Sequence, residues 1–442
     1  MTLSLPLDSQ FKSHLQRVLG GVNDAAQATG AESVVIHAGL ERFAFLDDQP
    51  YPYKVNPWFS WLAPVLHAPG SLILLRNNKR PILYFVSPVD YWHAPPVVPV
   101  EPWTSELEIR ALPDASSALD ALPGAAERVC WIGEPAPPHA SWSHNPSQVL
   151  LHLEQLRCRK SAYEVSCMRE ATRLGVAGHL AAEKAFRDGA SELAIHLAFL
   201  GASRQSESGL PYGNIVGLNE NAATLHYQLQ SADAPAQHHS LLIDAGASCR
   251  GYASDITRTH AATPGLFASL IEGMHALQQE LCARVAPGVD WRELHLAAHL
   301  LVSRLLRDAG VLRISGEDAV AMGISSIFLP HGLGHLLGLQ VHDVGGFRAG
   351  AQSPPIARPT GHASLRLTRL LETAMMVTVE PGIYFIDSLL QQLRAGAHAP
   401  HVDWSLIDAL RPCGGIRIED DVLVTATGHD NLTRAAFASA AR

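Results

Sequence analysis

The sequence predicts an α+β protein with two domains, a smaller α/β domain followed by a larger α+β domain. Its 442 residues suffice for two or three domains. The first part alternates helical with strand-like patterns, whereas the second part carries acidic residues inside apolar, strand-like segments. These observations place the domain boundary at residue 155, so that the two domains cover residues 1–155 and 156–442.

The composition indicates a large buried core and excludes several classes of partner. Hydrophobic residues make up 47% of the chain and charged residues 17%, which is below the roughly 25% charged residues of an average soluble chain. A net charge of −9 argues against a nucleic-acid surface, because phosphate binding needs a basic face. An anionic membrane surface is disfavoured for the same reason, and no segment approaches the ~20 apolar residues of a membrane span.

The cysteines and the first residues bear on location. The six cysteines are scattered, with no C-x-x-C pair, which is typical of free thiols in a reducing compartment. The stretch MTLSLPLDSQFKSHLQRVLG contains no apolar run of signal-peptide length. We therefore expect a cytoplasmic protein.

The first domain has a clear order of expected elements. SQFKSHLQRVLGGV has the pattern of an amphipathic helix, and ESVVIHAG, SLILLRN and PILYFV have the pattern of strands, the last two joined by the turn-like NNKR. HAPPVVPVEPW is expected to be a loop. This domain contains no cluster of candidate metal ligands.

The second domain begins in a strongly helical stretch at residues 148–202, rich in good helix formers. The elements expected after it are a hairpin at 241–260, helices at 264–309, an irregular Gly/His-rich segment at 331–346, a Pro-rich loop at 353–361 and strands around residues 380 and 419.

The hairpin LLIDAGASCRGYASDITRTH holds two aspartates, which are poor strand formers and costly to bury. If Cys249 and Arg250 form its turn, Asp244 faces Asp255 directly, with Cβ atoms about 4.5–5.5 Å apart. Like charges there are destabilising. Two interpretations stay open: a register shift of one or two residues, aided by Gly251, that leaves both exposed, or a cation between them.

Two glutamates occur in similar settings. Glu380 lies in the apolar stretch MMVTVEPGIYF, and Glu419 follows Arg417 by two residues in GGIRIEDDVLV, so these two side chains share one face of a strand. A single carboxylate in a strand is usually solvent-facing. Four carboxylates in apolar, β-like settings make that explanation strained, because their charges need compensation.

HGLGHLLGLQVHDVGG supplies His331, His335 and His342 and is not the H-E-x-x-H zinc motif. Each histidine alone is more often structural, but the glycines allow the close backbone approach that a site needs. Two Asp, two Glu and one His form an oxygen-rich set that can neutralise two divalent cations. Such ligands favour manganese, cobalt or zinc over copper.

These motifs, in this order, resemble the Xaa-Pro dipeptidases (prolidases) of the "pita-bread" metallopeptidase family, and in particular the bacterial subgroup that includes organophosphorus acid anhydrolases. The similar segments span nearly the whole chain: FLDDQPYPYKVNPWFSWL, SPVDYWH, YGNIVGLNENAATLHY, IDAGASCRGYASDITRT, PHGLGHLLGLQVHDVGGF, LRLTR, VTVEPGIYFI and GGIRIEDD. The resemblance implies a pita-bread catalytic domain at residues 156–442. It also implies an N-terminal domain that serves dimerisation and contributes to the partner's active site.

The resemblance implies five ligands for two divalent ions, manganese first and cobalt or zinc as alternatives: Asp244, Asp255, His335, Glu380 and Glu419. Asp255 and Glu419 would bridge the two ions. Glu380 would also act as the proton shuttle for the attacking water.

The resemblance also implies substrate-binding residues. His226 and His342 would contact the substrate and stabilise the transition state, and Arg366, the first arginine of LRLTR, would clamp the substrate's C-terminal carboxylate. Asp48 would reach across a homodimer to the substrate's amino group. The remaining pocket-lining residues would be Tyr212, His331 and Arg417.

The chain departs from the family pattern at three places, none of them a ligand. Ser254 precedes Asp255 where alanine is usual, Asp421 replaces asparagine in EDD, and Leu367 replaces cysteine in LRLTR. The second change adds an acid beside the site.

The expected activity is hydrolysis of Xaa-Pro dipeptides with C-terminal proline, with organophosphate hydrolysis as a side activity. One alternative is an aminopeptidase P-like exopeptidase acting on longer X-Pro peptides, against which the LRLTR clamp argues. Another is a non-catalytic pita-bread binding module, which the presence of all five implied ligands disfavours.

Overall fold

The computed structural model describes residues 6–442. The chain divides into two compact units. The first comprises the described residues up to Cys167 together with Gly350–Ser353, and the second comprises Met168–Ala349 and Pro354–Arg442. None of the helices within residues 6–442 is long and apolar enough to cross a membrane.

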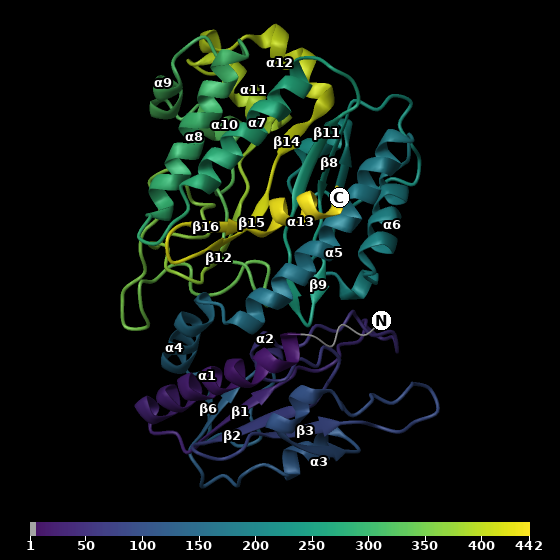
Figure 1. The fold of residues 1–442 in the computed structure, drawn as a ribbon, viewed down its shortest axis with the longest axis vertical. Coiled ribbons are helices and arrows are strands. Elements are labelled where there is room, and N and C mark those ends of the chain that lie inside the picture. Colours follow the sequence, from purple (N-terminus) through teal and green to yellow (C-terminus); the bar gives the residue numbers. More distant parts are fainter. Residues whose placement is uncertain (1–5) are drawn as a thin grey trace. The chain divides into compact units, whose positions relative to one another are not determined.

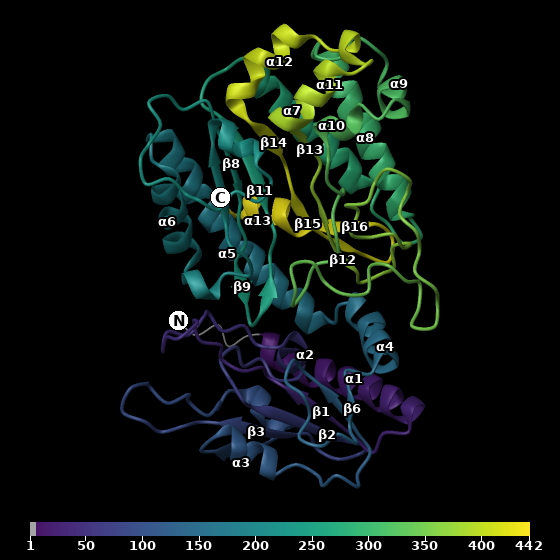
Figure 2. The same ribbon diagram turned by 180° about the vertical axis from the view of Figure 1, so that it is seen from behind.

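The first unit is built on a six-stranded mixed sheet with the order β4-β3-β2-β1-β5-β6. The helix and the three strands expected from the sequence are confirmed, and β2 and β3 are antiparallel neighbours across the predicted turn. Helices α1 and α3 lie on opposite faces of this sheet (Figures 1 and 2). The elements are α1 (Pro6–Thr29), β1 (Ser33–His37), α2 (Pro57–Leu62), β2 (Leu72–Arg76), β3 (Ile82–Val86), β4 (Glu108–Leu112), α3 (Ala115–Asp120), β5 (Val129–Ile132), β6 (Ser143–His144) and α4 (Ser147–Cys158).

The predicted helical stretch is confirmed as three helices, α4, α5 (Ala162–Arg187) and α6 (Glu192–Ser203). In the second unit, α5 and α6 cover one face of a sheet with the order β11-β8-β7, made by β7 (Ile215–Leu218), β8 (Ser240–Asp244) and β11 (Thr257–Ala261).

Strand alternation in β8 determines where its acidic residue lies. Leu241 and Ile243 pack with residues of α5 and α6. Leu242 faces the opposite side and packs with Tyr384. Because side chains alternate across a strand, Asp244 lies on the side of Leu242, away from the helices.

The hairpin register differs from the expected one by two residues. Its turn is formed by Arg250 and Gly251, both with positive φ (51° and 87°), as a type I′ turn requires. Asp244 therefore pairs with Thr257, and the predicted turn at Cys249–Arg250 with direct pairing of Asp244 and Asp255 is wrong. A shift of two residues keeps every side chain on its face of the sheet.

The alternative that this shift exposes both acids is also wrong, because Asp255 is only 4% exposed and Asp244 is half-buried. Beyond the register, the hairpin is continued toward its turn by the short strands β9 (Ser248–Cys249) and β10 (Tyr252–Ala253). The two acids therefore lie where the β8–β11 ladder ends.

The remainder of the second unit places helices around two small sheets. Helix α7 packs on β11, β12 and β14, and both figures show α8 beside α7 (Figures 1 and 2). The sheets have the orders β12-β15-β16 and β13-β14. The elements are α7 (Leu266–Ala283), α8 (Trp291–Asp308), α9 (Gly316–Ala321), α10 (Ser325–Phe328), β12 (Met376–Val379), β13 (Gly382–Tyr384), α11 (Asp387–Ala395), α12 (Trp404–Leu410), β14 (Gly415–Arg417), β15 (Asp420–Val424), β16 (His429–Asn431) and α13 (Leu432–Ala440).

The predicted strands at the two glutamates are confirmed, with both acids at strand ends. Glu380 directly follows β12, and Glu419 lies between β14 and β15. The segments expected to be irregular, 331–346 and 353–361, contain no helix and no extended strand. Strand ends and irregular segments thus meet in the second unit, and this is where side chains can converge on a pocket.

Candidate functional site

A pocket of about 380 Å³ in the second unit gathers nearly all of the site residues expected from the sequence. The acids, histidines and arginines come from β8, the end of β12, β14 and the segments around them. Its lining comprises Leu225, His226, Asp244, Asp255, Pro330, His331, Gly332, Gly334, His335, His342, Arg358, Ala363, Ser364, Arg366, Glu380, Arg417 and Glu419.

Tyr212 joins the two aspartates of the hairpin. Its Oη lies 2.7 Å from Asp244 Oδ1 and 2.5 Å from Asp255 Oδ1. Burial and the two carboxylates raise the pKa of the Tyr212 phenol well above its ordinary value. Burial likewise raises the pKa of Asp244, although Arg417 opposes this rise. Tyr212 is absent from the pocket lining, so it supports the two acids from outside the pocket.

Arg417 is the fixed cation of the site. Its Nη2 donates to Asp244 Oδ2 at 2.7 Å, its Nη1 to Tyr384 Oη at 2.6 Å and its Nε to Thr257 Oγ1 at 3.1 Å. Only 4% of Arg417 is exposed. One buried guanidinium therefore organises the hairpin and β13 around the pocket.

Glu419 is the most deeply buried acid of the pocket, at 2% exposure. Its Oε2 accepts a hydrogen bond from Thr257 Oγ1 at 2.6 Å. Burial raises the pKa of Glu419 well above its ordinary range, and the nearby carboxylates, Asp255 first among them, raise it further. This carboxyl group therefore lacks the positive charge that its ionised form needs.

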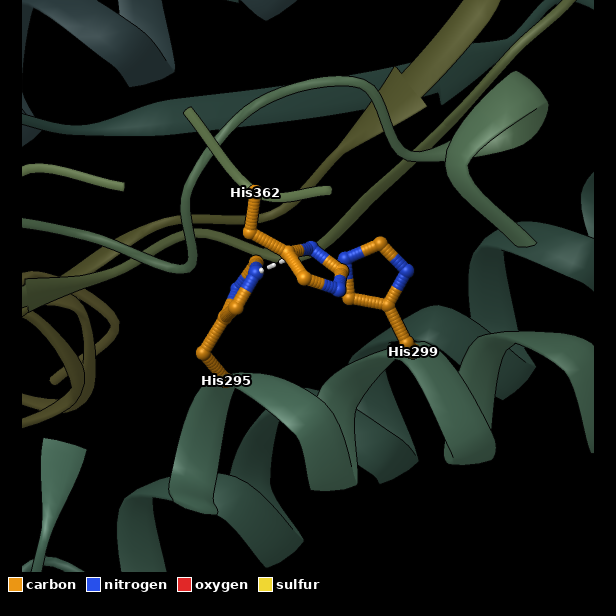
Figure 3. Close-up of side chains that lie close together, drawn as sticks. All are labelled: His295, His299 and His362. Carbon is orange, nitrogen blue, oxygen red and sulfur yellow. Dashed lines mark hydrogen bonds between the residues drawn. The ribbon is translucent and has the colours of Figure 1, made fainter. Parts of the chain in front are cut away.

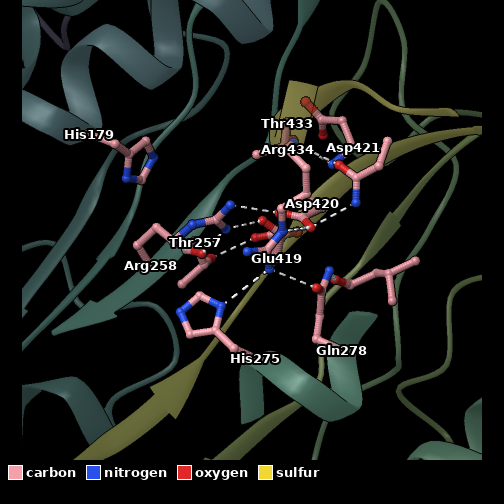
Figure 4. A network of polar contacts seen from close by, with 12 residues as sticks. His179, Thr257, Arg258, His275, Gln278, Glu419, Asp420, Asp421, Thr433 and Arg434 are labelled. Carbon is pink, nitrogen blue, oxygen red and sulfur yellow. Dashed lines mark hydrogen bonds and ion pairs between the residues drawn. The ribbon is translucent and has the colours of Figure 1, made fainter. Parts of the chain in front are cut away.

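A second ionic network lies behind Glu419 (Figure 4). Asp420 accepts from Arg258 Nη2 and Arg434 Nε, each at 2.7 Å. Burial tends to raise the pKa of Asp420, but these two arginines lower it to about 2. Arg258 also donates to the backbone oxygen of Glu419 at 2.7 Å. The paired Asp420 thus anchors the backbone from which Glu419 reaches the pocket.

The segment 333–337 runs alongside β12 and brings a histidine to Glu380. The backbone N–H of Thr378 donates to His335 O, and that of Glu380 donates to Leu333 O. Gly334 has φ +158°, and a Cβ there would lie 2.1 Å from Thr378 O. This close approach explains why the segment needs glycine at that position.

His335 faces two acids. Its Nε2 lies 3.5 Å from Asp255 Oδ2 and 3.6 Å from Glu380 Oε1, and its Nδ1 lies 3.0 Å from Leu336 O. Burial tends to lower the pKa of His335, but Asp255 and Glu380 raise it to about 9. Burial raises the pKa of Glu380 to about 7, against the opposing effect of His335. The imidazole therefore takes the position of a cation between these carboxylates.

Asp255, His335 and Glu419 each offer a ligand atom within 4.8 Å of the others, and all three are buried. Asp244 and Glu380 line the same pocket. Arg417 and, when protonated, His335 form ion pairs with three of these four carboxylates, so that negative charge stays in excess around them. Oxygen-rich, under-compensated sets of this kind are suited to hard divalent cations.

Three further histidines line the pocket. His331 lies 2.9 Å from Tyr384 Oη through Nε2, and the ring of His342 stands perpendicular to that of His335 at a centroid distance of 4.5 Å. Burial lowers the pKa of His331 to about 3 and that of His342 to about 4. These two imidazoles are therefore neutral at pH 7. His226, the third, is exposed.

Two arginines on the segment before β12 complete the lining. Arg366 is exposed, and no ion pair involving it occurs within residues 6–442. Arg358 was missed by the sequence analysis. Its Nε donates to Leu365 O at 2.6 Å and its guanidinium stacks on Phe347 at 4.6 Å, so Arg358 has structural partners that Arg366 lacks.

Asp48 belongs to the first unit, where it lies in an exposed turn and its N–H donates to Asp47 Oδ1 at 2.7 Å. Thr257 and Tyr384 were also not predicted as site residues from the sequence. Both lie inside the motifs ITRT and GIYF, but a threonine in a strand and a tyrosine in an apolar stretch carry no functional signal of their own.

Comparison with known families matches both parts of the chain. Residues 166–426 match the model of metallopeptidase family M24, and residues 9–155 match the N-terminal domain of Xaa-Pro dipeptidases. The chain is 46% identical over 436 residues to an Xaa-Pro dipeptidase of Xanthomonas euvesicatoria, covering 98% of this chain and 99% of the relative. It is also 46% identical over 432 residues to one of Stenotrophomonas maltophilia, covering 97% and 98%.

Several solved structures with the same fold are aminopeptidases P. The aminopeptidase PepP of Pseudomonas aeruginosa superposes with a TM-score of 0.72 at 23% identity, covering 97% of this chain and 98% of that one. Proline aminopeptidase P II from Yersinia pestis gives a TM-score of 0.72 at 24% identity, covering 99% and 97%. At this level of identity the likeness shows the fold alone, which is the predicted pita-bread architecture.

Proposed function

Because the chain belongs to metallopeptidase family M24 and is a prolidase-type member of it, we propose that it hydrolyses dipeptides with a C-terminal proline at the pocket of the second unit. The observation that carries this proposal is Arg366. An arginine without an ionic partner among residues 6–442, on the wall of a pocket that ends in four acids, is suited to capture a substrate carboxylate.

We propose that Asp244, Asp255, His335, Glu380 and Glu419 would hold two divalent ions, which would supply Lewis-acid chemistry to the pocket. The donor set fits such ions, because burial and mutual repulsion raise the pKa of Glu419 well above its ordinary range, and cations would relieve both. Oxygen ligands favour manganese, with cobalt and zinc as further candidates. When bound, such ions act as Lewis acids and lower the pKa of water.

The side chains of the chain supply the remaining steps. Glu380, which lines the pocket, would take a proton from the attacking water and deliver it to the proline nitrogen, which has no N–H of its own. His342 and His226 would donate to the substrate oxygen as negative charge develops on it, a contribution typically worth a few kcal/mol per donor. Arg417 and Tyr212 hold the two aspartates of the hairpin through the hydrogen bonds described above, and His331 contacts Tyr384, which accepts from Arg417.

Selection of dipeptides would come from charge at both ends of the substrate. Arg366 can pair with the carboxylate bidentately, whereas a longer peptide has no carboxylate at that position. We propose that Asp48 meets the substrate's amino group from the partner subunit of a homodimer whose contacts involve the domain at residues 1–155. The free cysteines among the described residues agree with a cytoplasmic location, which we propose as well.

Two other activities bear on the same pocket. An aminopeptidase with the same fold is known, and such an activity would cleave longer X-Pro peptides. That activity would leave Arg366 without a function. Hydrolysis of P–F or P–O bonds, which we propose as a side activity, would use the same acids, because a tetrahedral phosphoryl centre resembles the transition state of peptide hydrolysis.

The metal proposal can be tested by removal and return of metal. The protein is treated with chelator, titrated with Mn²⁺, and assayed on Ala-Pro while bound metal is counted. We expect no activity without metal and recovery that levels off at two equivalents per chain. Asp255→Asn should lose activity on Ala-Pro and bound Mn²⁺. Asp188→Asn, which changes an exposed acid paired with Lys184, should keep both the activity and the bound Mn²⁺. Full activity in a metal-free sample contradicts the proposal.

A further inference from the structure

Three histidines converge at a second place in the second unit, outside the acidic centre (Figure 3). His295 and His299 lie one turn apart on α8, and both point toward His362 on the facing loop. The three ring centroids are 4.6–4.7 Å from one another, with interplanar angles of 72–88°. One nitrogen of each ring lies within 4.8 Å of the other two.

The hydrogen bonds of this cluster leave nitrogens unsatisfied. His295 Nε2 lies 2.9 Å from His362 Nδ1, and His299 Nδ1 lies 3.0 Å from Ser325 Oγ. Within residues 6–442, His299 Nε2 has no hydrogen-bond partner, and neither has His295 Nδ1. Both side chains are 1% exposed. Burying a polar atom without a hydrogen-bond partner is costly, so packing alone explains this arrangement poorly.

We propose that His295, His299 and His362 form a mononuclear site for a zinc-type divalent ion, bound through three imidazole nitrogens. The ligand atoms are His295 Nε2, His299 Nε2 and His362 Nδ1. In a tetrahedral zinc site with Zn–N bonds of 2.0–2.1 Å, ligand nitrogens lie about 3.3 Å apart. Two of these nitrogens are already 2.9 Å apart, so a small opening of the pair would admit the ion.

The surroundings of the cluster agree with this assignment. Ser325 orients His299 through its other ring nitrogen, as partners of metal-bound histidines commonly do. Burial lowers the pKa of His295 to about 2 and that of His299 to about 3. Both rings are therefore neutral at pH 7 and need not lose a proton to bind. His362 is half-buried, which leaves a path for the ion.

The ligand type separates this site from the acidic centre. Imidazole nitrogens favour zinc, copper, nickel and cobalt, whereas manganese binds such sites weakly. The two centres would therefore fill with different ions in one molecule.

The site would also connect a helix to the pocket wall. His362 directly precedes Ala363 and Ser364, which line the pocket, and Arg366 follows on the same segment. An ion held jointly by α8 and His362 would fix this segment. The effect on substrate binding rests on the proposed function, whereas the binding of the ion does not.

The test counts metal in the full-length protein first loaded with Mn²⁺ and then dialysed against Zn²⁺, with both elements measured. The variants are His299→Gln, His362→Ala and the control His398→Ala/His401→Ala, which removes two other neighbouring histidines with ring centroids 6.0 Å apart. We expect wild type and control to hold one zinc equivalent more than either cluster variant, with the affinity for that equivalent lowered at least about 100-fold in the variants.

This difference in stoichiometry does not depend on how many ions the acidic centre holds. Equal amounts of bound zinc per chain in wild type and in a folded His362→Ala variant would overturn the proposal. Loss of the additional zinc equivalent in the control alone would overturn it as well. X-ray absorption at the zinc edge of wild type and His362→Ala supplies a second measurement. Loss of an imidazole-rich zinc signal in the variant supports the site, and identical spectra overturn it.

Discussion

Thr257 Oγ1 donates a hydrogen bond to Glu419 Oε2 over 2.6 Å. Arg417 Nε–H donates to the same Thr257 Oγ1 at 3.1 Å. The hydroxyl can therefore accept from the arginine while it donates to the ionised carboxylate of Glu419. A single threonine of the hairpin thus transmits the orientation of a buried arginine to the most buried acid of the pocket.

Replacing Thr257 tests this relay. In Thr257→Val, Glu419 loses its donor while the shape of the side chain is kept, and we expect Mn²⁺ affinity to fall about 10- to 100-fold, as for other residues that orient ligands. Thr257→Ser keeps the hydroxyl and should bind as wild type does. Isothermal titration of the metal-free proteins measures both, and equal affinities for Val and Ser variants would argue against the relay.

Arg366→Ala should weaken the binding of Xaa-Pro dipeptides without affecting the metals. A hydrogen-bonded pair with a charged group contributes about 1.5–3 kcal/mol, so we expect kcat/KM to fall roughly 10- to 150-fold, mainly through KM. Arg358→Ala is the matched control, because Arg358 lines the same wall but is engaged with Leu365 and Phe347. An unchanged KM in Arg366→Ala would remove this residue from the proposed clamp.

Gly334→Ala should destabilise the protein and displace His335. Its Cβ would lie 2.1 Å from Thr378 O, so the segment must move away from β12. We expect a loss of several kcal/mol in the free energy of unfolding, since backbone strain adds to lost hydrogen bonds. Gly201→Ala in α6, where a Cβ meets nothing within 4 Å, should instead stabilise by about 0.5–1 kcal/mol. Denaturant unfolding of the two variants compares them directly.

In the metal-free protein, the contribution of Glu380 and His335 to stability should fall as the pH rises, in opposition to the buried neutral histidines such as His331 and His342, whose contribution rises with pH. Burial raises the pKa of Glu380 from 4.5 to about 7. Against the effect of burial, Asp255 and Glu380 raise the pKa of His335 from 6.5 to about 9. Both groups hold protons more tightly in the folded state. Their contribution is complete below pH 4.5 and 6.5, respectively, and is lost as the pH passes 7 and 9.

Thermal unfolding of chelator-treated protein between pH 5 and 9 measures this loss. The Tm of wild type should fall relative to that of Glu380→Gln, which is neutral at every pH, as the pH rises from 5 to 7. The increase in Tm on adding Mn²⁺ should grow with pH, because bound ions replace these protons. A Tm difference between wild type and Glu380→Gln that stays constant from pH 5 to 7 would contradict the assigned role of burial.

Unusual settings drew attention to the acids, such as Asp244 in an apolar strand and Glu380 before Pro-Gly, and the resemblance to prolidases selected which histidines join them in the pocket. The sequence did not predict the register of the hairpin, because moving the turn by a single residue changes the pairing of the two strands by two residues. The alternation of side chains survived the error, since the true register differs by two.

The supporting residues could not be predicted because their role depends on partners distant in the sequence. Thr257 matters only because β11 lies against Glu419 and Arg417. The three-histidine cluster offered a partial signal, since His295 and His299 are spaced i, i+4 and share a helix face. Its third member, His362, lies in a loop whose path no local pattern determines.

The central claim is that an Arg366-lined, acid-rich pocket selects dipeptides. Its most direct test compares hydrolysis of Ala-Pro and Ala-Pro-Ala by one protein sample whose metal content is measured. We predict efficient cleavage of Ala-Pro, cleavage of Ala-Pro-Ala at least about 100-fold weaker in kcat/KM, since the carboxylate is misplaced, and two divalent ions per chain. Equal or faster cleavage of Ala-Pro-Ala would contradict the account and favour an aminopeptidase.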